Sequence, residues 1–141
     1  MARGGRGCEL SAGIMDIMLI AYWIVASLLA FVYLFAGGMK LIRSREALVA
    51  AGMGWATDIN RGLVKLVGLI EVLGALGVIL PGLVQQATLL APTAALGLVV
   101  VQGVAIGIHW RRGEAKSLPV NIVLLLLALV VAWLGAIVFT Q

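Results

Sequence analysis

A small set of charged and polar residues interrupts a chain that is otherwise strongly apolar. Glu71 is the most unusual of them, because it lies near the middle of Gly62–Leu80, an apolar run long enough to cross a bilayer. A charge at the centre of a membrane helix costs roughly 2.5–3.5 kcal/mol on insertion scales, so such a residue normally has a partner or a function. The candidate ligand-binding residues that we select are Lys40, Glu71, Gln102, His109, Arg111, Arg112 and Glu114.

The chemistry of Glu71 and His109 has two interpretations at this stage. Glu71 is either a structural bridge, protonated or ion-paired with Lys40 or an arginine, or a carboxylate that carries a proton or binds a ligand headgroup. His109 is either an interfacial residue beside Trp110 or a second proton carrier. Both residues are therefore candidate proton carriers, and no catalytic residue is assigned.

The spacing of the polar residues predicts where they meet. Gln102 and His109 are seven residues apart, so they lie on nearly the same face of a helix and about 10 Å apart along it. Glu71 lies about 9 Å beyond Lys65 along its own span. We therefore expect Glu71 and Gln102 at similar depth, where they share a hydrogen bond or line one cavity, with His109 and Arg111 at its lip.

Four long apolar runs must position these residues. The chain has 141 residues, of which 63% are hydrophobic and only 11% are charged, whereas soluble domains carry about 25% charged residues. Each run has about 19–22 residues, enough to span the ~30 Å hydrocarbon core as a helix. The sequence predicts an all-α membrane protein, a bundle of four transmembrane helices at residues 17–35, 62–80, 88–108 and 118–139.

The remaining segments complete a single membrane domain over residues 1–141. We expect a flexible tail over residues 1–15 and a short interfacial helix between the first two spans, ending near Gly52 and Gly54 before Trp55. Asn121 is expected to form a hydrogen bond between helices.

Glycine-rich faces should bring the helices together, because lipid gives helices no hydrophobic reason to associate. Gly68 and Gly74 flank Glu71 and leave room beside it, and Gly103–Gly107 is a GxxxG match. We expect this match to pack inside the bundle, while an oligomer through glycine-rich faces is the alternative.

Composition also limits cofactors and partners. The formal net charge is +4, but the basic residues lie between apolar runs rather than in a stripe with aromatics, so we expect no nucleic-acid partner. With Cys8 as the one cysteine and His109 as the one histidine, we expect no metal site, no internal disulfide and no covalently bound cofactor.

Lysine and arginine in the loops predict the orientation in the bilayer. Eight of them lie in the first and third loops, with Lys40 counted in the first, against Arg3 and Arg6 on the other side. Because basic loops stay in the cytoplasm, we predict cytoplasmic first and third loops and external termini.

Several short segments resemble the DoxX-like family of small four-helix membrane proteins. They are Leu34–Leu41, Gly54-Trp55, Gly68–Gly77 with Leu80-Pro81, and His109–Glu114. The resemblance implies a four-helix bundle in the bacterial cytoplasmic (inner) membrane, with Lys40, Glu71, His109, Arg112 and Glu114 as the positions to carry over. It also implies a link to quinone-coupled oxidation of sulfur compounds and to thiol-redox complexes, although Cys8 lies outside the matching segments.

Three functions follow as hypotheses. In the first, the bundle binds a quinone or similar lipophile in a redox-linked membrane system, and a membrane or soluble redox protein supplies electrons. In the second, the chain is a non-catalytic accessory or assembly subunit of a larger membrane complex. A small transporter or channel is the third and has the least support, because no span is broken. Whether the chain is an enzyme stays open.

Overall fold

The computed structural model describes the backbone of residues 4–140 and the side chains of residues 9–140. All regular structure in this range is helical, as predicted. The elements in chain order are α1 (Gly4–Ile42), α2 (Arg45–Ala50), the 3₁₀ helix η1 (Gly54–Thr57), α3 (Arg61–Val84), α4 (Leu90–Arg111) and α5 (Leu118–Phe139). Helices α1, α3, α4 and α5 are long and apolar enough to cross a membrane, so the predicted fold class is confirmed.

Two helices end four or more residues beyond the predicted ends of their spans. Helix α1 continues through Gly37 and Gly38 to Ile42, which places Lys40 in its last turn rather than in the first loop. Glycine is tolerated there because the helix packs tightly at this point, as described below. Helix α3 likewise continues through Pro81 to Val84, since proline removes a single backbone donor and the apolar pattern extends beyond it.

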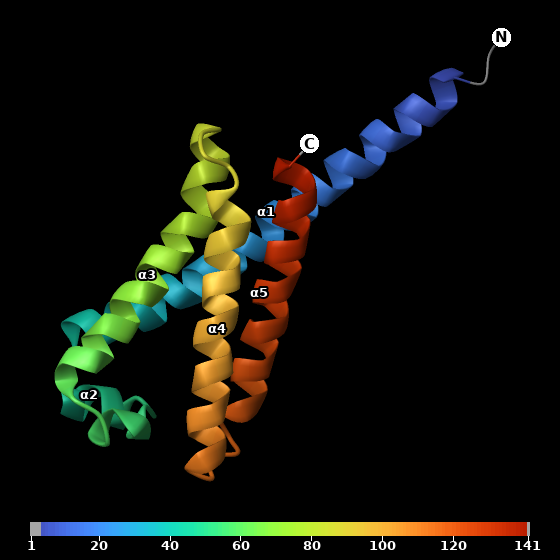
Figure 1. The fold of residues 1–141 in the computed structure, drawn as a ribbon. Coiled ribbons are helices and arrows are strands. Elements are labelled where there is room, and N and C mark those ends of the chain that lie inside the picture. Colours follow the sequence, from blue (N-terminus) through green and yellow to red (C-terminus); the bar gives the residue numbers. More distant parts are fainter. Residues whose placement is uncertain (1–3, 141) are drawn as a thin grey trace.

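The N-terminal segment is helical where a flexible tail was expected. Helix α1 begins at Gly4 and has 39 residues, about 58 Å at the usual rise, which is far more than a bilayer core requires. Its first part projects beyond the other helices (Figure 1), and residues 9–14 are exposed. Residues 1–3 and the side chain of Cys8 lie outside the described residues, and the flexibility of this segment stays a prediction.

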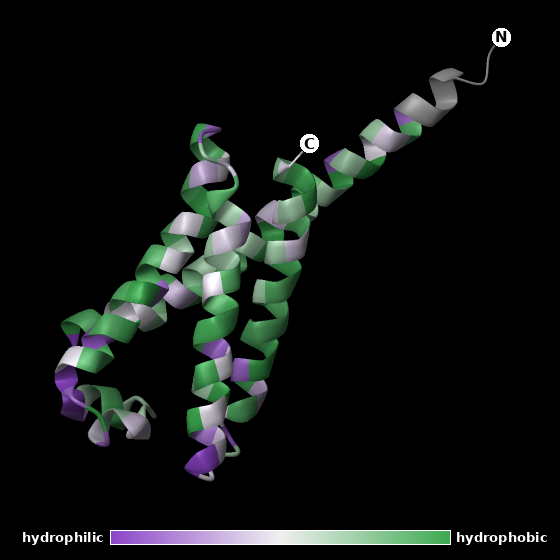
Figure 2. Ribbon diagram, in the orientation of Figure 1, coloured by the Kyte–Doolittle hydropathy of each residue, from purple (hydrophilic) through white to green (hydrophobic). Residues whose placement is uncertain are grey.

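The four long helices form a ring in which each contacts two neighbours. Helix α1 packs against α3 and α5, and α4 packs against α3 and α5. The first and third loops lie at one end of the bundle, opposite the α3–α4 turn and the C-terminus (Figure 1). Apolar residues cover the shafts of the helices, and hydrophilic residues gather in these two loops (Figure 2). The buried core between the shafts centres on Tyr22, Leu29, Val78, Leu98 and Val131.

Glycines on α3 bring it close to both of its neighbours. A Cβ on Gly68 would lie 2.8 Å from the backbone oxygen of Gly37 on α1, and a Cβ on Gly74 would lie 2.5 Å from Leu98 on α4. Both distances are shorter than any normal contact: at Gly68 the neighbour is backbone, so only glycine fits, whereas at Gly74 a larger residue would require the Leu98 side chain to shift. The prediction that small residues thin α3 beside Glu71 is therefore supported by these contacts.

The GxxxG match on α4 was assigned to the wrong face. Gly103 and Gly107 are exposed, and a Cβ on either would meet nothing within 4 Å among the described residues. The spacing of two glycines shows that they share a helix face, but it does not show which face meets a neighbour.

The first loop folds back under the end of α3. Ser44 caps α2 by accepting from the Ala47 N–H at 3.3 Å, and Asn60 caps α3 by accepting from the Gly62 N–H at 2.8 Å. Leu48, Ala56 and Val64 form a small buried cluster that joins α2, η1 and α3. A short helix after the first span was predicted, and α2 confirms it; its position at the membrane interface stays a prediction.

Candidate functional site

Lys40 and Glu71 form an ion pair across the contact between α1 and α3. The Lys40 Nζ lies 2.8 Å from Glu71 Oε1 and 2.6 Å from Oε2, and the residues are only 7% and 6% exposed. Gly37 lies one turn before Lys40 on α1 and leaves room for Glu71, and Gly68 lies one turn before Glu71 on α3 and leaves room for Lys40. The close approach of the two helices at these glycines therefore brings the charged groups together. This geometry agrees with the structural-bridge interpretation of Glu71, and it leaves a role in ligand binding untested.

Gln102 lies at the same depth in the bundle as Glu71, as their positions along the predicted spans indicated. Contacts of Gly74 with Leu98 and of Gly77 with Ala94 fix an antiparallel register between α3 and α4, and this register brings Glu71 opposite residues 101–102. The two side chains line one cavity, which was one of the two predicted arrangements. The other, a shared hydrogen bond, does not form, and the Gln102 amide nitrogen is buried without a partner among the described residues.

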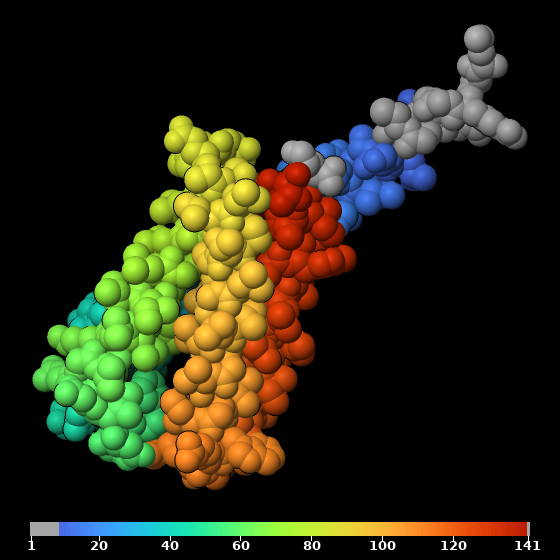
Figure 3. Space-filling view, viewed as in Figure 1, coloured from blue at the N-terminus to red at the C-terminus, as the bar shows by residue number. Residues whose placement is uncertain are grey.

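The cavity itself lies between α3 and α4 and has a volume of about 300 Å³. Most of its lining is aliphatic, and its polar members are Lys40, Glu71, Gln102, His109 and Asn121. Ile70, Val100 and Val104 line it and are also exposed on the outer surface of the bundle. The cavity therefore opens sideways between the two helices, on a surface that lipid would cover. Figure 3 shows the first loop and the start of α3 (green) beside the lower half of α4 (orange), at the end where His109 lies.

His109 lies at the loop end of the cavity and begins a chain of polar contacts that leads away from it. Its Nδ1 lies 2.6 Å from Glu114 Oε2, and the other oxygen of Glu114 accepts from Arg112 Nε at 2.6 Å. Arg112 also forms an ion pair with Asp58, which joins the third loop to the first. Hydrogen bonds from Arg112 and then His109 hold the pKa of the Glu114 carboxyl below its usual range.

The structure brings together most, but not all, of the predicted site. Lys40, Glu71, Gln102 and His109 line the cavity. Arg112 and Glu114 contact it only through His109, because neither lines it. Arg111 was expected at the lip, but it is exposed and lies outside the lining, since it follows His109 by two residues and so faces the other side of α4.

Three other residues contribute that the sequence did not single out for the site. The ring of Trp55 lines the cavity, with Lys40 Nζ 5.9 Å from its centroid, a cation–π distance. Asp58 ends the contact chain from His109. Asn121 also lines the cavity, but its side-chain amide donates to the Ser117 carbonyl of its own helix at 2.7 Å, so the predicted bond between helices is wrong.

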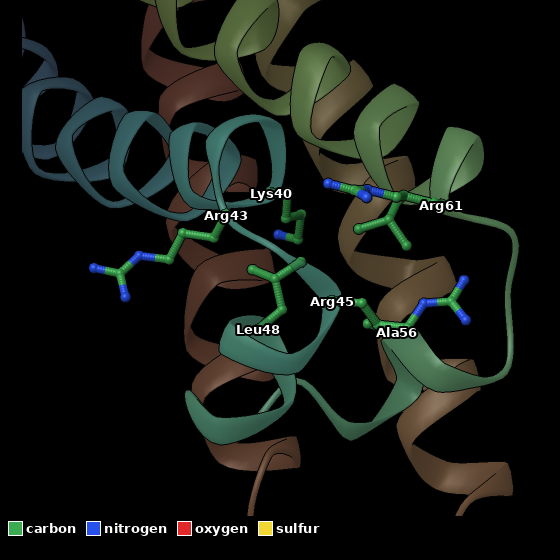
Figure 4. Close-up of a pocket in the computed structure, with 7 residues that line it drawn as sticks. Lys40, Arg43, Arg45, Leu48, Ala56 and Arg61 are labelled. Atoms are coloured by element: carbon green, nitrogen blue, oxygen red, sulfur yellow. The ribbon is translucent and has the colours of Figure 1, made fainter.

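A second recess lies under Lys40 and is much smaller. It has a volume of about 10 Å³, room for about one water, and Arg43, Arg45 and Arg61 are among its lining residues. The side chains of Arg43 and Arg45 point in opposite directions, away from the recess (Figure 4). Arg45 donates to the Ile59 carbonyl at 3.0 Å and so ties α2 to the start of α3. The recess is therefore a joint of the loop, and these guanidinium groups do not converge on one ligand.

Comparison with known proteins assigns the family. A family model described as the DoxX-like family matches residues 24–131, more than half of the chain. The chain belongs to the DoxX-like family. The match includes all seven candidate residues and leaves out the N-terminal segment that projects from the bundle. No curated protein and no solved structure matches this DoxX-like chain.

The DoxX-like site can hold an uncharged, largely apolar molecule. The Lys40–Glu71 ion pair is internally neutral, and the other polar groups of the lining are hydrogen-bonding groups rather than fixed charges: Trp55, Gln102, His109 and Asn121. In the described part of the chain, no three His, Cys, Asp or Glu residues are grouped so as to hold a metal ion. The residues present therefore suit a lipophile with a few polar atoms in its head.

Proposed function

We propose that this DoxX-like protein binds a quinone or similar lipophile as part of a redox-linked membrane system. The observation that supports this most directly is the cavity of about 300 Å³ that opens sideways toward lipid and has polar groups at both ends. A volume of this size accommodates an aromatic head and the first part of an apolar tail. The side opening would let the tail extend into the bilayer.

The residues of the site fit such a head. A quinone supplies two-electron chemistry when bound, and the chain supplies the surroundings. Gln102 offers an amide donor that has no partner among residues 9–140. His109 would accept or return a proton at its second ring nitrogen, and the neutral Lys40–Glu71 pair would border the head. A separate redox protein, in the membrane or in solution, would exchange electrons with the ligand.

The location of this activity is part of the proposal. We place the protein in the bacterial cytoplasmic membrane, with the first and third loops in the cytoplasm. Lys40 no longer counts toward this orientation, because it is buried and paired. The seven other basic residues of these loops still outnumber Arg3 and Arg6.

Binding of a short-tailed quinone tests the proposal. A benzoquinone with a decyl tail is titrated into the full-length protein in nanodiscs, with empty nanodiscs as the background. Filling the cavity with Ala105→Phe should weaken binding at least about tenfold, since Ala105 lines it. Gly97→Leu is the matched control, because it adds an apolar side chain on the open face of the same helix. Equal binding to wild type and Ala105→Phe would refute the cavity as the binding site.

A second function, an accessory or assembly subunit, is favoured by the exposed glycines of α4. Gly103 and Gly107 present an open face on which a helix of another membrane protein would pack closely. On this alternative, Gly103→Leu should remove a co-purifying membrane protein while quinone binding is unchanged. Retention of the same proteins by this variant would count against the alternative.

A further inference from the structure

The two nitrogens of the His109 ring have different surroundings. Nδ1 contacts Glu114, which lies outside the cavity, at 2.6 Å. His109 itself lines the cavity, and its other nitrogen, Nε2, has no hydrogen-bond partner among the side chains that the structure describes. The ring therefore connects a charged contact chain on one side with an apolar cavity on the other.

The contact chain fixes which ring nitrogen carries the hydrogen. Glu114 receives a hydrogen bond from Arg112, which in turn pairs with Asp58, so the Glu114 carboxyl is ionised and only accepts. Nδ1 must then donate to it. In a neutral imidazole the second nitrogen carries a lone pair, so Nε2 is the acceptor that the His109 ring, which lines the cavity, has left to offer.

The protein offers little to satisfy this acceptor from inside the cavity. Ile59 and Ile108 line the same end and have no side-chain donor, and Lys40 is held by Glu71. The remaining polar groups of the lining form no hydrogen bond with it among the described residues: Gln102 lies about 10 Å away along α4, the Asn121 amide donates to Ser117, and the Trp55 indole N–H makes no bond to His109. A donor on the ligand is the partner that this arrangement lacks.

We propose that the ligand of this cavity carries a hydroxyl group that donates to His109 Nε2, as a phenol, a lipophilic alcohol or the reduced, hydroxylated form of a quinone does. The inference rests on the proposed function, which supplies the lipophile, and it adds the chemical class of the head. Glu114 and Arg112 are positioning residues in this account, because they act on the ligand only through the His109 ring. The head is uncharged, since the Lys40–Glu71 pair leaves no free charge in the lining.

Two probes that differ only in the donor test this inference. 4-Decylphenol and its methyl ether have the same ring and tail, and the ether keeps the oxygen but lacks the hydrogen. Their dissociation constants are measured by calorimetry with the full-length protein in nanodiscs. Wild type should bind the phenol about tenfold more tightly than the ether, which is the usual effect of one hydrogen bond.

Variants at the ring separate hydrogen bonding from the bulk of the added methyl group. In His109→Leu the ratio of the two dissociation constants should fall to about one, whereas a purely steric effect would leave it unchanged. His109→Gln restores an acceptor and should recover part of the ratio. Glu114→Gln lets either nitrogen carry the hydrogen and should lower the ratio, while Arg111→Gln, which changes an exposed neighbour outside the lining, should leave it at the wild-type value.

The outcomes distinguish the two levels of the proposal. Equal binding of both probes to wild type, weakened for both by Ala105→Phe, overturns the hydroxyl inference and leaves the lipophile site intact. Tighter binding of the ether also overturns it, because the hydroxyl hydrogen would then contribute nothing to binding. If neither these probes nor the decyl quinone binds, the proposed function fails and the inference fails with it.

Discussion

The ammonium group of Lys40 contacts both carboxylate oxygens of Glu71, at 2.8 and 2.6 Å, beside the glycine contact of α1 and α3. The pair lies at the inner end of a cavity that the same two residues line. It holds two helices together, as the structural-bridge interpretation requires, while a role of Glu71 in carrying a proton or binding a ligand headgroup stays a prediction.

Removing one partner of the pair should cost far more than removing both. Lys40→Met leaves the Glu71 carboxylate buried without its cation, and we expect a loss of about 3–5 kcal/mol in the free energy of unfolding. The double variant Lys40→Met/Glu71→Leu should recover most of this loss, because apolar side chains replace both charges. Unfolding in mixed micelles with increasing dodecyl sulfate measures both values. Lys65→Met, at an exposed lysine of α3, is the control, and strictly additive losses in the double variant would contradict the prediction.

Substitution at the glycine contact should also lower the free energy of unfolding, although by less than breaking the ion pair that the contact positions. A Cβ on Gly37 would lie 2.7 Å from the Gly68 carbonyl oxygen, so Gly37→Ala must push the helices apart, and we expect a loss of about 1–3 kcal/mol. The new methyl group of Gly38→Ala would meet nothing within 4 Å in the described part of the chain, so this variant should gain up to about 1 kcal/mol from better helix propensity. The same micelle unfolding assay compares the two neighbours. Equal effects at both positions would show that the contact does not limit stability.

Much of this architecture was predictable from hydropathy, and the pairing of helices was not. Uninterrupted apolar runs predicted the four long helices, because run length alone decides whether a segment can span a bilayer. The same criterion ended the first span before Gly37 and so placed Lys40 in a loop. Glycine weakens a helix in water, but here it permits the close contact that keeps α1 helical to Ile42.

The sequence predicted how deep each site residue lies along its helix, but it did not predict which way each side chain points. Glu71 and Gln102 were expected at one level, and the register of α3 and α4 places them there. Arg111 was wrongly expected at the lip of the cavity, because a residue two positions after His109 faces the opposite side of the helix. Trp55 and Asp58 come from a loop whose path no periodicity describes. The open face of Gly103 was missed because a motif of small residues does not identify its neighbour.

The contact of Glu114 with Arg112 should appear in the acid titration of that carboxyl. The pKa of Glu114 is lower in the folded protein than in the unfolded chain, where it is about 4.3. The contact therefore stabilises the folded state fully above about pH 4.3, and this stabilisation is lost as the pH falls through the folded-state pKa. Carboxyl-detected NMR with labelled glutamate should therefore give a midpoint below about 4.3 for Glu114. Arg112→Gln should raise this midpoint, whereas Arg111→Gln should not. An unchanged midpoint in Arg112→Gln would contradict the contact.

The predicted orientation can be tested by labelling in intact cells. On a Cys8→Ser background, a cysteine at Gln86 in the α3–α4 turn should react with a membrane-impermeant maleimide. A cysteine at Lys116, in the exposed third loop at the other end, should react only after the cells are opened. The reverse pattern would place the first and third loops outside.

The measurement that tests the central claim most directly is mass spectrometry of lipophilic molecules retained after gentle purification, comparing wild type with Glu71→Gln and Ala105→Phe. The account predicts a quinone or hydroxylated lipophile in wild type that is absent from folded Ala105→Phe; the amount in Glu71→Gln, whose Lys40 is left unpaired, is compared only in the folded fraction of that variant, where it should be reduced. The same bulk phospholipids in all three, with no enriched lipophile in wild type, would contradict it.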